Sequence, residues 1–316
     1  MTPFFCDMLK AIYCIFLWSV VLLACSPSHA QTGLKDNPGI AWVSDTQEPL
    51  WFEQLVRRKN GNIEATRLIF KDMVQQHFKS LFIAGDVVSL GYKGKKWKRM
   101  DQYLDSCRNG GMSVHALLGN HDVMFRPRKG MSAFNKRFPE AVHTGYVKVV
   151  DSVAFVLLNS NFKHLSEDEI QQQQKFYTQI LREMDADSGV VAVIVSCHHS
   201  PYSNSKKVGS NGKVQEKFVP LFIQSKKCRV FISGHAHVFQ HFRNHGKDFL
   251  VIGGGGGIRH PLKTAKGAPR DLAPDYKPLF HYLILKRIGR DLFLTSRFLL
   301  ADFSGFQEGF AIQIKG

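Results

Sequence analysis

The chain has 316 residues, of which 44% are hydrophobic and 22% charged, so it can bury a sizeable core in one or two domains. The formal net charge of +16 suits an anionic substrate or surface but says little about the fold. The sequence contains no long uninterrupted basic run. Composition and charge pattern therefore argue against a dedicated nucleic acid partner.

The N-terminal segment has the pattern of a secretory signal peptide. Residues Ala11 to Ala24 are apolar apart from Ser19, and this run is shorter than the ~20 residues that a membrane span needs. Ser28-His29-Ala30 then offers a small-x-small cleavage site. We therefore expect a signal peptide over residues 1–30 and a secreted or periplasmic protein.

A second interpretation of the same segment stays open. Leu22-Leu23-Ala24-Cys25 resembles the lipobox of bacterial lipoproteins, although leucine in the second place is not the commonest residue there. Cleavage would then remove a leader of 24 residues, and Cys25 would carry a lipid anchor to the membrane.

Strand and helix patterns alternate along residues 31–316, which predicts a single α/β domain without an internal boundary. Short apolar or β-branched runs predict strands at Ile40–Val43, Leu81–Ala84, Ser113–Leu118, Tyr146–Val150, Ala154–Leu158, Val190–Ser196, Arg229–Ile232, Phe249–Ile252, Phe280–Leu285 and Leu292–Phe298. Helical periodicity or a capping signal predicts helices at Glu64–Phe78, at Lys95–Arg108, from the N-cap Ser166 to about Asp185, and at Val214–Gln224.

Side chains able to bind metal ions follow five of these strands. They are Asp45 with Gln47, Asp86, Asn120 with His121, His198 or His199, and His235 with His237. In an α/β sheet the carboxyl ends of the strands meet at one crevice, so we expect these side chains to converge. The set is sufficient for two metal ions, and the carboxylate of Asp86 is suited to bridge them. Two metals about 3.5–4 Å apart generate a hydroxide at neutral pH and orient a phosphoryl group for attack.

The segment Gly119-Asn120-His121-Asp122 combines three chemical properties in consecutive residues. Asn120 offers a neutral amide oxygen to a metal, and His121 can move a proton near neutral pH. Asp122 can fix the tautomer of that imidazole. The alternative is a polar turn with an incidental histidine, which the other four strand-end motifs disfavour.

These motifs resemble those of the calcineurin-like metallophosphoesterase superfamily, over Ser44 to His237. The residues that carry the resemblance are Asp45, Gly85-Asp86, Gly119-Asn120-His121-Asp122, His199 and Gly234-His235-Ala236-His237. The resemblance implies a four-layer α/β/β/α sandwich with two divalent metal ions, which could be Mn, Fe or Zn.

The resemblance also implies a role for each site residue. One metal would be held by Asp45, Asp86 and His237, with Gln47 beside them, and the other by Asp86, Asn120, His199 and His235. His121 would face the scissile bond, where it stabilises phosphoryl oxygens or protonates the leaving group, with Asp122 behind it.

The sequence departs from the family pattern at three places. Gln47 stands where histidine is usual, and its neutral oxygen is a harder ligand, which leaves the occupancy of the first metal site open. The segment from Asp86 to Gly91 lacks the Asp-Arg of protein Ser/Thr phosphatases and the tyrosine with which purple acid phosphatases bind ferric iron. In the pair His198-His199, the spacing to Pro201 favours His199 as the ligand and His198 beside it, although the two could exchange roles.

Three further features carry less information. The glycine run Gly253–Gly257 is either a close backbone approach beside the site or a tight bend. Arg126 follows the Asn-His-Asp segment closely and is a candidate for binding an anionic substrate. Cys107, Cys197 and Cys228 are too few and too widely spaced for a disulfide framework, and the last two fit buried core thiols.

Together these observations predict a hydrolase of phosphate mono- or diesters that acts on a small phosphorylated substrate. Two alternatives stay open: a non-catalytic protein that binds anionic ligands on the same fold, and a nucleotide pyrophosphatase. No G-x-S-x-G or P-loop motif competes with this interpretation.

Overall fold

The computed structural model describes residues 38–50, 53, 61–263 and 267–316. The predicted signal peptide and lipobox lie outside these residues. Among the described residues, no helix is long and apolar enough to cross a membrane.

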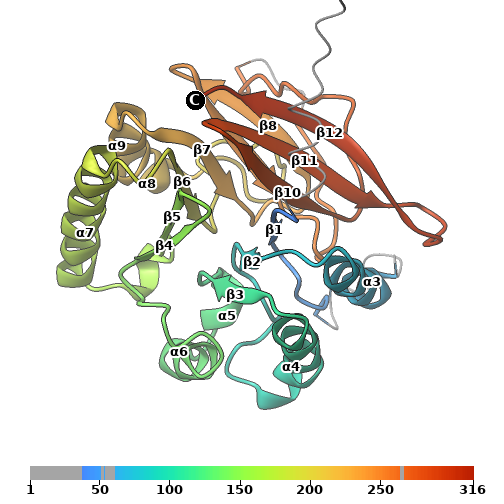
Figure 1. Cartoon of the computed structure of the whole chain (residues 1–316). Helices are drawn as coiled ribbons and strands as arrows, with labels where there is room; N and C mark the ends of the chain where they lie inside the picture. The colour runs from blue at the N-terminus through green and yellow to red at the C-terminus, as the bar shows by residue number, and fades with distance from the viewer. Residues whose placement is uncertain (1–37, 51–52, 54–60, 264–266) are drawn as a thin grey trace, which may run out of the picture. The chain divides into compact units, whose positions relative to one another are not determined.

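The first sheet has six strands in the order β12-β11-β10-β1-β2-β3. Their bounds are β1 (Ile40–Val43), β2 (Ser80–Ile83), β3 (Ser113–Ala116), β10 (His281–Ile288), β11 (Asp291–Leu299) and β12 (Phe306–Ile314). The three N-terminal strands run parallel, and the three C-terminal strands extend the sheet in antiparallel register beyond β1. Figure 1 shows the C-terminal strands β10, β11 and β12 in orange and red.

The second sheet also has six strands, in the order β4-β5-β6-β7-β9-β8. Their bounds are β4 (Tyr146–Val150), β5 (Val153–Leu158), β6 (Ala192–Cys197), β7 (Cys228–Ser233), β8 (Phe239–Asn244) and β9 (Lys247–Ile252). The four central strands are parallel, and an antiparallel strand closes each edge.

Helices cover the outer faces of the two sheets (Figure 1). The helices near the first sheet are α3 (Asn62–Gln75), α4 (Gly94–Asn109), the short turn α5 (Asn120–Val123) and α6 (Pro127–Asn135). Those near the second sheet are the 3-10 turn η1 (Phe162–His164), α7 (Glu167–Ala186), α8 (Gly212–Lys217) and α9 (Val219–Gln224). Ser166 caps α7 as predicted, since its hydroxyl accepts the main-chain N–H of Glu169.

Aromatic side chains hold the inner faces of the sheets together. The ring of Phe155 on β5 lies 4.4 Å from that of Phe82 on β2 and 5.8 Å from that of Trp42 on β1, measured between centroids. All three are fully buried. A second core lies between the outer face of the second sheet and its helices, where Phe222 meets Phe231 at 5.4 Å. The predicted four-layer α/β/β/α sandwich is therefore confirmed.

Some predicted elements differ from the observed ones. The helix expected over Val214–Gln224 is two helices, α8 and α9, because the ring of Pro220 cannot continue a helix without loss of a hydrogen bond. The sequence patterns do not predict α6, β8 and β12, in which polar and apolar residues are mixed. The three described cysteines are free and buried, as expected for Cys197 and Cys228.

Candidate metal centre

Three candidate ligands lie on strained backbone directly after strands. Asp45 follows β1 with φ 59°, Asp86 follows β2 with φ 52°, and His235 follows β7 with φ 64°. Residues other than glycine rarely adopt this left-handed conformation. Such strain collects at functional sites, where the surrounding structure holds it.

Glycines next to these ligands allow main chains to approach closely. A Cβ atom at Gly119 would lie 2.0 Å from the main-chain nitrogen of Asp86. One at Gly234 would lie 1.9 Å from Oγ of Ser44 and 2.4 Å from Oδ2 of Asp45. The glycine of each motif is therefore required by packing of one strand end against another.

The candidate ligands form two groups that share one carboxylate. The donor atoms of Asp86, His198 and His235 lie within 4.8 Å of one another, and so do those of Asp45, Asp86 and His237. Asp86 occupies the position that a bridging ligand needs. Carboxylate oxygens and imidazole nitrogens in this number suit divalent transition metals, so the residues present fit a dinuclear centre.

The two adjacent histidines after β6 have different surroundings. His198 is fully buried; its Nε2 lies 3.1 Å from Oδ1 of Asn120 and 3.3 Å from Oδ2 of Asp86. Its Nδ1 lies 2.9 Å from the carbonyl oxygen of Ala84, a contact that fixes Nδ1 as the protonated nitrogen and leaves Nε2 available to a metal. His199 turns its Nδ1 to the hydroxyl of Ser160, at 2.8 Å.

This geometry favours His198 over His199 as the metal ligand, which is the alternative that the sequence left open. The spacing to Pro201 favours His199 instead. That spacing does not show which imidazole turns toward Asp86, because the answer depends on where β6 ends.

The side-chain amide of Gln47 can supply an oxygen ligand to the first group. In the orientation that satisfies both ends of the amide, its nitrogen donates to the main-chain oxygens of Asp86 at 3.0 Å and Asp45 at 3.1 Å. Its oxygen then lies 3.2 Å from Nε2 of His237. The reverse orientation points the nitrogen at Asp86 Oδ2 (3.3 Å) and leaves the oxygen facing only carbonyl oxygens. We therefore assign the first orientation.

Burial and mutual charge strongly perturb the ionisation of this cluster. Burial alone would lower the pKa of His198, but the carboxylate of Asp86 raises this pKa to about 9. Burial, and next the charge of His198, lower the pKa of His199 to about 3. Burial, and next the imidazoles of His199 and His198, lower the pKa of His235 well below its usual value. Although burial opposes it, the charges of His198 and His121 hold the pKa of Asp86 well below normal. A divalent ion would take over this stabilisation of Asp86 and release the proton of His198.

The candidate proton donor His121 is held by main-chain contacts. Its Nδ1 lies 3.1 Å from the carbonyl oxygen of Ser89, and its main-chain N–H donates to Oδ1 of Asp86 at 2.7 Å. Its Nε2 lies 4.0 Å from Oδ2 of Asp86, and the side chain is 15% exposed. The ring is therefore anchored at Nδ1 and turns Nε2 toward the site.

Asp122 binds main-chain groups in place of the predicted contact with the imidazole of His121. Its buried carboxylate accepts hydrogen bonds from the N–H groups of Gly119 at 2.9 Å, Val88 at 3.1 Å and Val87 at 3.3 Å. These bonds join the segments after β2 and β3. The tautomer of His121 is instead set by the carbonyl of Ser89, which a sequence pattern cannot reveal.

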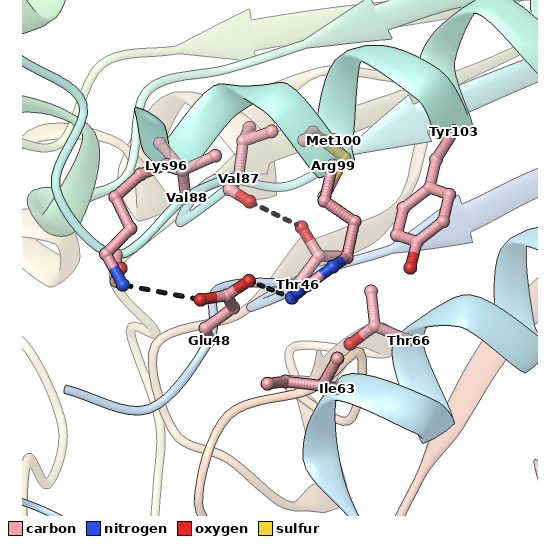
Figure 2. Close-up of a pocket in the computed structure, with 11 residues that line it drawn as sticks. Thr46, Glu48, Ile63, Thr66, Val87, Val88, Lys96, Arg99, Met100 and Tyr103 are labelled. Atoms are coloured by element: carbon pink, nitrogen blue, oxygen red, sulfur yellow. Dashed lines mark hydrogen bonds and ion pairs between the residues drawn. The ribbon is translucent and has the colours of Figure 1, made fainter. Parts of the chain in front are cut away.

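Side-chain contacts hold the segment after β1 in place at Thr46 and Glu48 (Figure 2). The hydroxyl of Thr46 donates to the carbonyl oxygen of Val87 at 3.0 Å. The carboxylate of Glu48 forms ion pairs with Lys96, at 3.3 Å, and with Arg99, both on α4. These contacts flank Gln47 on both sides and limit its movement.

The glycine run Gly253–Gly257 is a close backbone approach behind the site. The N–H groups of Gly255 and Gly257 donate to the carbonyl oxygens of Ser44 and Asp45, both at 2.9 Å. A Cβ atom at Gly257 would lie 2.4 Å from Cε1 of His237. Space beside the ligands, rather than a positive φ, explains this run.

A groove of about 550 Å³ opens beside the second ligand group. Asn120, His199 and His235 line it, together with residues 160–164 after β5 and residues 210–213 at the start of α8. Lys163 in η1 and Lys213 in α8 also line the groove, and no sequence motif marks them. Arg126, the predicted substrate-binding residue, is not among the lining residues; its guanidinium lies over the ring of Tyr92, 5.4 Å from the centroid.

Comparisons with solved structures find the same fold. A purple acid phosphatase from yellow lupin (Lupinus luteus) aligns with a TM-score of 0.66 and 14% identity over 87% of this chain and 53% of its own. The present chain thus spans about half of that enzyme. GAP50, the anchor in the inner membrane complex of Plasmodium, aligns with a TM-score of 0.62 and 14% identity, over 87% of this chain and 88% of its own. A dimetal phosphatase from Danio rerio aligns with a TM-score of 0.52 and 12% identity, over 87% of this chain and 98% of its own.

Comparison of the sequence with family models identifies the family. The search of curated proteins gave no match. The family model for calcineurin-like phosphoesterases matches residues 39–239, which include every candidate ligand. Members of this family use a dinuclear divalent metal centre, and the two donor groups around Asp86 have the composition that such a centre requires. The chain therefore belongs to the calcineurin-like phosphoesterase family of metal-dependent phosphoester hydrolases.

Proposed function

We propose that this protein hydrolyses phosphate monoesters or diesters of small molecules at a centre that Asp86 bridges. The observation that carries the proposal is the position of this carboxylate in both donor groups, with the imidazole of His121 beside it. When bound, the two metal ions supply an activated water and polarise the phosphoryl oxygens.

The other side chains around Asp86 would bind the metals or contact the substrate. Asp45, Gln47 and His237 would complete one metal site, and Asn120, His198 and His235 the other. His121, anchored through Nδ1, presents Nε2 to the phosphoryl group. From there it can protonate the leaving oxygen or donate a hydrogen bond to a phosphoryl oxygen.

Two rival functions remain to be separated from this one. A non-catalytic protein that binds anions would use the same ligands, but it would gain nothing from an imidazole nitrogen held beside the bridging carboxylate. A nucleotide pyrophosphatase would use the same centre on a different bond. The presence of His121 favours catalysis, and the substrate bond must be found by assay.

The test is a panel assay of purified protein. Nitrophenyl phosphate, bis(nitrophenyl) phosphate and a nucleoside diphosphate sugar are each offered with Mn²⁺, with a chelator, and with Mn²⁺ restored. We expect turnover of at least one ester, lost with the chelator and recovered with the metal. Turnover of the diphosphate alone would identify a pyrophosphatase. Metal-dependent binding of phosphate with no turnover of any substrate would favour the non-catalytic alternative.

A further inference from the structure

The groove beside the second ligand group is large enough for more than the phosphoryl group that is attacked. Its volume of about 550 Å³ falls in the range of small-molecule sites. Asn120, His199 and His235 reach it from the metal centre, so an ester bound to the metals would extend its remaining part into this space.

The groove is positively charged. Lys163, in η1, and Lys213, at the start of α8, both line it and are exposed. Among the described residues that line the groove, none carries a carboxylate. Neither lysine forms an ion pair with a described residue, whereas the nearby Lys217 pairs with Glu216 at 2.9 Å.

Lys163 lines the same groove as His199 and His235. Other groups of the lining already have partners: Ser160 meets His199 and Asn161 donates to the carbonyl oxygen of Leu118. The two ammonium groups are thus the strongest free donors that a ligand in the groove would meet.

We propose that Lys163 and Lys213 bind a second phosphate group on the substrate, so that the enzyme prefers phosphoesters with another phosphate on the leaving group. The inference rests on the proposed function, because it assumes that the ester is hydrolysed at the metal centre. Lysine ammonium groups are compact point charges suited to phosphate oxygens. Among the described residues that line the groove, the one phenyl ring is that of Phe162, which packs against Phe218 and is 7% exposed.

The experiment compares substrates that differ only in the second phosphate. Alkanediol bisphosphates of increasing chain length are compared with the corresponding monophosphates, in wild type, Lys163→Met and Lys213→Met. Each substitution should raise KM for the preferred bisphosphate by roughly tenfold or more, the contribution of one charge-assisted hydrogen bond. The monophosphate should change by less than about twofold.

Lys79→Met is the matched control, because Lys79 is exposed at the amino end of β2, opposite the end that leads to Asp86. It should leave both substrates unchanged. A second measurement avoids turnover: calorimetric binding of an alkane bisphosphonate and the corresponding alkylphosphonate. The bisphosphonate should bind more tightly to wild type, and this difference should shrink in both groove variants.

Each result has a distinct meaning. Equal losses for mono- and bisphosphate would show general electrostatic steering and overturn the inference, as would no loss at all. If wild type hydrolyses the monophosphate but does not prefer any bisphosphate, the inference fails and the proposed function stands. If wild type hydrolyses no ester with metal present, the proposed function fails.

Discussion

His121 has a contact pattern that separates catalysis from metal binding. Its Nδ1 meets the carbonyl oxygen of Ser89, and its Nε2 lies 4.0 Å from Oδ2 of Asp86. Neither nitrogen belongs to the two groups of clustered donor atoms. We therefore propose that this side chain acts on the substrate and does not hold a metal.

We predict that His121→Ala keeps its metal but loses turnover by about 10²–10⁴-fold, the usual contribution of positioned proton transfer. The loss should be smaller for nitrophenyl esters, whose leaving group needs little protonation, than for alkyl esters. Metal analysis and steady-state kinetics on the same sample test this. Parallel loss of metal and activity would make His121 a ligand, and equal losses for both ester types would assign it to the phosphoryl oxygens.

His198 and His199 provide a second test at this scale. We predict that His198→Ala loses metal from the second site, because the Nε2 that faces Asp86 and Asn120 disappears. His199→Ala should keep both metals, since its ring nitrogens belong to neither group of clustered donor atoms. Metal content by elemental analysis decides the point. The reverse pattern would restore the assignment to His199 that the sequence spacing suggests.

The glycine run after β9 shows how an element supports the ligands. Its main chain forms hydrogen bonds with the main chain of Ser44 and Asp45. The ring of His237 packs so close to Gly257 that a Cβ atom there would clash with it. We predict that Gly257→Ala displaces His237 and lowers metal affinity or activity by roughly 10–100-fold, as loss of a ligand's support does. Gly94→Ala is the control, because a Cβ atom there meets nothing within 4 Å. Wild-type metal content in Gly257→Ala would contradict this role.

Features that depend on strand order alone were predictable from sequence. Asp45, Asp86 and Asn120 follow short apolar strands, and parallel strand ends meet at one edge. Features that depend on tertiary packing were not. The roles of His198 and His199 depend on where β6 ends, and the partner of His121 comes from the main chain of another loop. Lys163 and Lys213 line one groove because the fold brings η1 and the start of α8 to the same place, and no residue pattern marks them.

At the scale of the whole molecule, the candidate centre joins the two sheets. Asp45, Asp86 and Asn120 follow strands of the first sheet, and the imidazoles of His198 and His235 follow strands of the second. No single sheet holds a complete donor group. The sandwich is thus the smallest unit that can form the site.

Export remains a prediction at this scale, made from residues outside those that the structure describes. We expect the mature protein to begin at Gln31, or at Cys25 with an attached lipid. Mass spectrometry of protein purified from its native source distinguishes the two forms. An intact segment from Met1 to Ala30 would contradict both.

The central claim is that Asp86 bridges two metals that turnover requires. The most direct test is to measure metal content and turnover on the same preparations of wild type and Asp86→Asn. We predict two divalent ions per active wild-type chain. The variant should hold at most one and be inactive, because an amide replaces the shared carboxylate with little change in shape. Full turnover by Asp86→Asn, or by wild-type protein without bound metal, would contradict the account.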